Sequence, residues 1–202
     1  MPSKSSELSG EDIARATLYR ILAALLANVP DQRSLEVLQS LRGDPSTEVG
    51  VAVNAVAASA REVISTPREL KDEFNTLFIG LVRGELLPYA SYYLTGFLHE
   101  KPLARLRGDM AGMGIAAQSG VPEPEDHIAT ICEIMAGLVD GAVLGEPASP
   151  EAQARFFSTH LEPWAPVFFG DLQKADAARF YRAVGRLGAA FVDVERRAFE
   201  MT

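Results

Sequence analysis

The residues best suited to chemistry form one short run, Glu123-Pro124-Glu125-Asp126-His127. Its carboxylates could receive a guanidinium group in bidentate fashion, and a neutral imidazole beside Asp126 could donate a hydrogen bond or take up a proton. A structural interpretation is equally available, because proline and acidic residues are typical of the first turn of a helix. That interpretation leaves His127 unexplained, since a protonated ring is disfavoured at a helix start. A helix cap and a binding site therefore stay open as alternatives.

A second run, Gly84-Glu85-Leu86-Leu87-Pro88-Tyr89-Ala90-Ser91-Tyr92-Tyr93, gathers tyrosines behind a proline. Proline stiffens the backbone, and tyrosine offers a large amphipathic contact area at a low cost in conformational entropy. Such a surface suits an extended apolar peptide. The tyrosines could equally fill a helical bundle beneath a long loop, and composition alone does not decide between the two.

Motifs of known enzyme classes are absent from the sequence. His99, His127 and His160 form no H-x-x-x-H pair, and there is no C-x-x-C, phosphate-binding loop or G-x-S-x-G elbow. Cys132 lies about 140° around a helix from His127 and continues an apolar stripe, where cysteine behaves as a small hydrophobe. We therefore expect a binding protein without metal or cofactor, and a hydrolase using Asp126 and His127 as an acid–base pair is the weaker alternative.

Composition narrows the class of protein further. The 202 residues are 48 % hydrophobic and 23 % charged, which is typical of one globular domain. A net charge of −8 argues against a nucleic-acid surface and against binding to an anionic membrane. A single cysteine excludes an intramolecular disulfide, and no stretch resembles a signal peptide or a membrane span. We expect a cytoplasmic protein.

Hydrophobic spacing predicts an all-α, single-domain bundle of about nine or ten helices over residues 1–202, with residues 1–8 as a flexible arm. Residues 47–65 keep helical spacing overall, although their first valines alternate as in a strand. The other expected helix starts and stops are Ser9 with Asp12, Pro30, Ser34, Gly43, the capping run Thr66-Pro67-Arg68-Glu69, Pro102, Ser149-Pro150, Pro163-Trp164 and Asp176 as the cap of the last helix.

The tyrosine run lies in the least regular part of this pattern, and the acidic run lies at the start of its most regular part. Between Ile79 and Glu100 the periodicity breaks down, which predicts a long irregular segment acting as a binding loop or as a hinge for domain swapping. From Pro124 we expect the longest helix, unbroken as far as Gly145.

The two runs also resemble a known family. Glu123 to His127 matches the E-P-x-D-H motif of the TorD/DmsD/NarJ-type redox-enzyme maturation chaperones. The stretch from Gly80 to Tyr93 is similar to their G-x(n)-P-P-Y-x-S-x-Y segment. Leu87 replaces the first proline, and Ala90 stands where the family often has glutamate. The similarity covers roughly residues 70–195 and includes Phe74 to Gly80, His160-Leu161-Glu162-Pro163-Trp164, Asp171-Leu172 and Phe180-Tyr181.

The resemblance implies a TorD-like all-α fold and a chaperone that binds the twin-arginine signal peptide, the apo form, or both, of a molybdenum or tungsten oxidoreductase. Asp126 and His127 would contact the signal, with Glu123 nearby. The groove would be lined or supported by Pro88, Tyr89, Ser91 and Tyr93. The second run looks most similar to chaperones of formate dehydrogenases. We expect a monomer or a domain-swapped dimer, and a helical scaffold for a folded partner is the alternative function.

Overall fold

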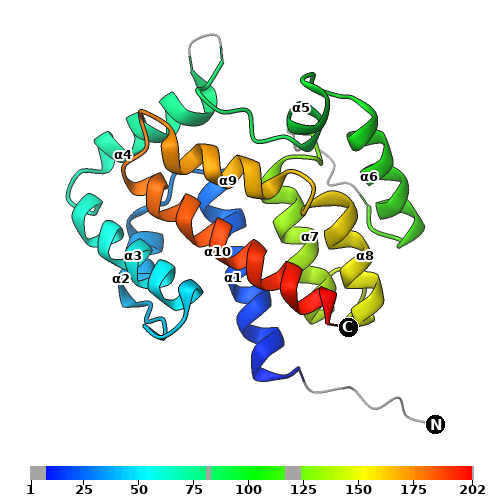
Figure 1. Cartoon of the computed structure of the whole chain (residues 1–202). Coiled ribbons are helices and arrows are strands. Elements are labelled where there is room, and N and C mark those ends of the chain that lie inside the picture. The colour runs from blue at the N-terminus through cyan, green and yellow to red at the C-terminus, as the bar shows by residue number, and fades with distance from the viewer. Residues whose placement is uncertain (1–7, 81–82, 117–123, 202) are drawn as a thin grey trace.

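The computed structural model describes residues 8–80, 83–116 and 124–201, and within these ranges every regular element is a helix. This confirms the prediction of an all-α bundle (Figure 1). The elements are α1 (Gly10–Ala27), α2 (Gln32–Ser40), α3 (Glu48–Val63), α4 (Pro67–Phe74), a π-helical turn η1 (Asn75–Ile79), α5 (Ala90–Thr95), α6 (Lys101–Gly112), α7 (Ile128–Asp140), α8 (Pro150–His160), α9 (Ala165–Lys174) and α10 (Phe180–Glu200).

Helix α7 lies at the centre of the core. Ten of its 13 residues are buried, and α1 packs along it. Helix α10 covers the other part of the bundle by packing against α3 and α9 (Figure 1). Cys132 is fully enclosed on α7, and burial raises the pKa of its thiol. The interpretation of Cys132 as a small core hydrophobe is therefore the one that fits its surroundings.

Local signals predicted several helix starts correctly. The hydroxyl of Ser9 accepts the N–H of Asp12, and Thr47 and Ser149 cap α3 and α8 in the same way. Thr66 was expected to cap α4, but its side chain makes no capping bond there. Because Pro67 has no N–H, the first turn of α4 needs one partner fewer than an ordinary helix.

Asp176 does not cap the last helix, so that prediction is wrong. Helix α10 begins at Phe180, and the carboxylate of Glu73 on α4 accepts the N–H groups of Arg179, Phe180 and Tyr181 at 2.7, 3.2 and 2.8 Å. The cap therefore comes from a residue more than a hundred positions away, which local capping rules do not consider.

The middle of the chain also differs from the prediction. The segment between Ile79 and Glu100 contains α5, although it was expected to be irregular. Helix α7 begins at Ile128 instead of Pro124 and ends at Asp140, where Gly141 adopts a left-handed φ of 85°. It is therefore shorter than α10, which has 21 residues. The second helix starts at Gln32 with Asp31 as its cap and ends at Ser40, before Gly43.

Residues 1–7 of the expected arm lie outside the described ranges. Among the helices that are described, none combines the length and the hydropathy that a membrane span requires.

Candidate functional site

The two runs singled out in the sequence meet in space. The N–H of Ile128 donates to the carbonyl of Pro88, and the N–H of Ala90 donates to the carbonyl of Asp126, both at 2.9 Å. These bonds form an antiparallel bridge between Tyr89 and His127, whose rings pack edge to face at 5.1 Å. The starts of α5 and α7 are thereby held together.

Asp126 contributes its side chain to the same junction. Its carboxylate accepts the N–H of Ser91 at 2.8 Å, so Asp126 binds two successive N–H groups at the start of α5. Both Asp126 and Ser91 are buried, and the Ser91 hydroxyl accepts the N–H of Glu100 at 3.3 Å. Asp126 therefore fixes where α5 begins. It accepts N–H groups as an N-cap residue does, although it lies in a distant part of the chain.

His127 is the N-cap of α7. Its Nδ1 accepts the N–H of Ala129 at 3.1 Å, so this nitrogen carries no proton. The side chain is only 8 % exposed. The position of a histidine at a helix start, unexplained by the sequence, follows from this bond, because a neutral imidazole can serve as the capping acceptor.

Glu125 pairs with a cation of the chain itself. Its carboxylate lies 2.7 Å from the guanidinium of Arg107 on α6, and the hydrogen bond from Arg107 lowers the pKa of Glu125. Glu123 lies outside the described residues. An incoming guanidinium would have to displace Arg107 to reach Glu125 in bidentate fashion.

The tyrosines of the second run face the bundle to different degrees. Tyr93 is half-buried, packs against Trp164 and Phe168, and donates to Asp171 at 3.2 Å. Pro88 is buried. These contacts agree with the interpretation in which the tyrosines fill the helical bundle. They also fix the position of the exposed residues that follow Tyr93.

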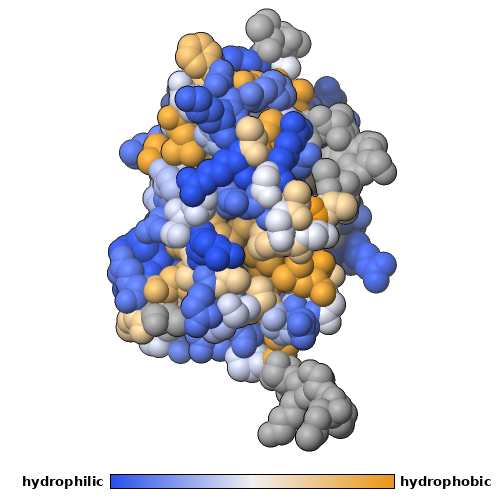
Figure 2. Space-filling view, turned by 90° about the vertical axis from the view of Figure 1, so that its right-hand side faces the viewer, coloured by the Kyte–Doolittle hydropathy of each residue, from blue (hydrophilic) through white to orange (hydrophobic). Residues whose placement is uncertain are grey.

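That continuation is an apolar strip on α5 and the turn after it, formed by Leu94, Phe97 and Leu98. Their exposed fractions are 43, 70 and 40 %. We call these three residues the apolar strip. They were not singled out as site residues in the sequence, and helical spacing does not relate them, because α5 ends at Thr95 and Gly96 adopts a left-handed φ of 82° before Phe97. Figure 2 looks at the side of the molecule that carries α6 and α8, where hydrophobic and hydrophilic surface alternate closely.

Beside the strip lies a cavity of about 290 Å³ between α5, α6, α7 and α8. Ala90, Leu94, Leu106 and Ile131 form its apolar wall, and Asp126 reaches it from the junction. His160 also lines it, 2.8 Å from Asp109. Burial lowers the pKa of His160, although Asp109 opposes that shift. Lys101 and Arg105 also line the cavity, and they were not singled out in the sequence.

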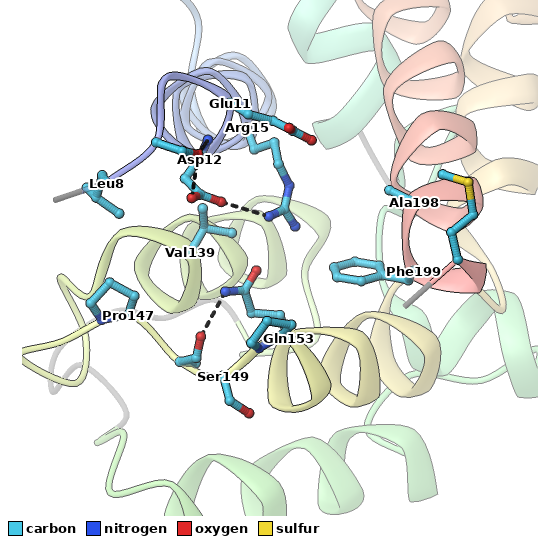
Figure 3. A pocket seen from close by; sticks show the side chains of 14 residues that line it. Leu8, Glu11, Asp12, Arg15, Val139, Pro147, Ser149, Gln153, Ala198 and Phe199 are labelled. Carbon is cyan, nitrogen blue, oxygen red and sulfur yellow. Dashed lines mark hydrogen bonds and ion pairs between the residues drawn. The ribbon is translucent and has the colours of Figure 1, made fainter. Parts of the chain in front are cut away.

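A second hollow, of about 670 Å³, lies where the start of α1, the α7–α8 connection and the end of α10 meet (Figure 3). Its half-buried cation, Arg15, is held in bidentate fashion by Glu195 and also by Asp12. Tyr19 donates to the same Glu195 carboxylate at 2.9 Å. These groups tie α1 to α10. None of the residues predicted for the site lines this hollow, so the smaller cavity is the candidate site.

In the part of the chain that the structure describes, no three histidine, cysteine or acidic side chains are grouped so that they could hold a metal ion.

Comparisons with known proteins agree with the sequence motifs. The family described as "Nitrate reductase delta subunit" matches residues 44–170. The chaperone protein TorD of Vibrio cholerae is 30 % identical over 200 residues, covering 96 % of this chain and 86 % of that protein. The chain belongs to the TorD/DmsD/NarJ-type redox-enzyme maturation chaperone family. This chaperone is also 29 % identical to TorD of Shewanella loihica, over 92 % of each chain.

A solved structure supports the fold of this chaperone. A crystal structure described as a redox enzyme maturation protein from Archaeoglobus fulgidus superimposes with a TM-score of 0.56 at 21 % identity, over 98 % of this chain and 99 % of that one. The expectations of a redox-enzyme maturation chaperone, and of a protein that is not an enzyme, are confirmed by the named relatives.

Proposed function

We propose that this chaperone acts in the cytoplasm, where it binds the twin-arginine signal peptide and the apo form of a molybdenum or tungsten oxidoreductase until the cofactor is inserted. The observation that carries the proposal is the exposed apolar strip beside the cavity at the Tyr89–His127 junction. Exposed apolar surface next to a concave site is typical of peptide-binding proteins.

The apolar part of the signal peptide is the segment that suits this surface. The apolar strip of Leu94, Phe97 and Leu98 offers side chains that a bound apolar peptide would shield from water. Asp126 and His127 support binding by holding α5 and α7 in place, and Asp126 also reaches the cavity. Tyr89, Ser91 and Tyr93 belong to the same support, with Glu123 next in sequence to this turn. A formate dehydrogenase is the client that the Leu87–Tyr93 sequence favours.

Removal of the most exposed side chain of the strip tests peptide binding. Phe97→Ser should weaken binding of a labelled twin-arginine leader peptide tenfold or more, because burial of an aromatic side chain contributes about 1.5–3 kcal/mol. Its free energy of unfolding should stay within about 0.5 kcal/mol of the wild type, since the side chain is 70 % exposed. Fluorescence anisotropy and urea denaturation measure the two quantities.

Val37→Ser is the matched control, because Val37 is 57 % exposed on α2, away from the strip. Equal peptide affinity in the two variants would contradict the proposed surface. The client is identified by pull-down from the native cytoplasm with mass spectrometry, once with the leader present and once with it deleted. Recovery of an immature oxidoreductase only when its leader is present supports the proposal, and recovery without the leader favours the scaffold alternative.

A further inference from the structure

Two cations at the rim of the cavity form no ion pair with any residue that the structure describes. Lys101 and Arg105 lie on successive turns of α6, on one helical face, and both line the cavity. Neither forms an ion pair or a hydrogen bond with another described side chain. Arg107, on the same helix, is instead held by Glu125.

The proximity of Lys101 and Arg105 is unfavourable in the empty chaperone. Like charges four residues apart on a helix repel each other by a few tenths of a kcal/mol. The carboxylate that lines the cavity, Asp126, is buried and already accepts the N–H of Ser91, and Asp109 lies against His160. Neither cation forms an ion pair with these carboxylates, although Asp126 lines the same cavity and Asp109 follows Arg105 by four residues on α6.

We propose that Lys101 and Arg105 bind an acidic side chain of the client peptide, whose apolar neighbours occupy the cavity and pack on the apolar strip. The inference rests on the proposed function and defines its ligand as an apolar segment that carries a carboxylate. Ion pairing satisfies both cations, and the exposed Leu94 covers the apolar residues beside the carboxylate. The arginine pair of a signal peptide binds away from this rim, because Lys101 and Arg105 repel it.

The probes are twin-arginine peptides with a Leu/Ala segment in which one glutamate is moved position by position, each matched by a peptide with glutamine at that position. Affinity is measured by fluorescence anisotropy for the wild type and for Lys101→Gln/Arg105→Gln. In at least one register the glutamate peptide should bind the wild type about threefold or more tightly than its glutamine match, which is the range of a partly exposed ion pair. The preference should vanish in the double variant and weaken at high salt.

The matched control is Arg68→Gln/Lys71→Gln, which removes the same two charges from exposed positions on α4. It should keep the preference for glutamate. Glutamate and glutamine peptides that bind the wild type equally in every register would overturn this inference and leave the proposed function standing, as would a preference that survives in Lys101→Gln/Arg105→Gln. Failure of every peptide to bind the wild type would overturn both.

Discussion

Substitution of Asp126 distinguishes a carboxylate that positions α5 from one that contacts the charge of the peptide. Asp126 is 1 % exposed, and its bond to the buried N–H of Ser91 is 2.8 Å long. A hydrogen bond to a charged group contributes about 1.5–3 kcal/mol, so Asp126→Ala should lower the free energy of unfolding by about 2 kcal/mol. Asp126→Asn keeps an acceptor oxygen at the same place, and the weaker neutral bond limits the loss to about 1 kcal/mol.

The effect on peptide binding should follow the geometry of α5. If Asp126 is a positioning residue, Asp126→Asn binds a twin-arginine leader peptide within about twofold of the wild type, while Asp126→Ala binds about tenfold more weakly. If its charge contacts a guanidinium, both variants lose affinity to the same degree, because both remove the charge. Urea denaturation followed by circular dichroism gives the stability, and anisotropy at low urea gives the affinity.

Asp72→Ala, at an exposed position on α4, controls for removal of one negative charge. Two results would refute the positioning role of Asp126. One is a free energy of unfolding of Asp126→Ala within about 0.5 kcal/mol of the wild type, since surface changes have effects of that size. The other is an Asp126→Asn variant that binds peptide as poorly as Asp126→Ala.

Two further predictions concern stability. Glu73→Ala should lower the free energy of unfolding by about 3 kcal/mol, because three N–H groups at the start of α10 lose a charged acceptor. The control Glu69→Ala, on the exposed side of α4, should change it by less than about 0.5 kcal/mol. Equal urea midpoints of the two variants would contradict the capping role of Glu73. Burial lowers the pKa of His160, so the unfolded chain takes up a proton first and stability should fall as the pH drops below about 6.5. His160→Gln should show a smaller slope of stability against pH in that range, and an unchanged slope would argue against this origin.

The helices could be predicted from sequence where their signals are local. Ser9, Thr47 and Ser149 stand directly before the apolar periodicity that they cap, and the structure finds each of them capping. Prediction failed where a distant group supplied the cap. Glu73 has the capping role that was predicted for Asp176, and it lies 106 residues before Arg179, whose N–H it accepts. No rule based on neighbours in sequence could choose it.

The start of α7 failed for the same reason. Pro124 has every local mark of a first helical residue. The next residues instead form a turn, because Asp126 is used by α5 and His127 by α7. That the two runs meet was suggested by the family resemblance, since spacing alone does not bring Tyr89 to His127. Lys101 and Arg105 were overlooked because cations four residues apart on a helix are common, and only the fold shows that they border a cavity.

The tie between Arg15 and Glu195 joins positions 180 residues apart. On the ribosome, α1 is made before α7 and can dock on it once Asp140 has emerged, but until α10 has been synthesised the Arg15 guanidinium has only Asp12 of its own helix as a partner. Contacts so distant in sequence slow folding, because long loops must close before they form. The bidentate tie therefore forms only after α10 has been made, so a newly made copy of this chaperone becomes competent later than its first helices would allow.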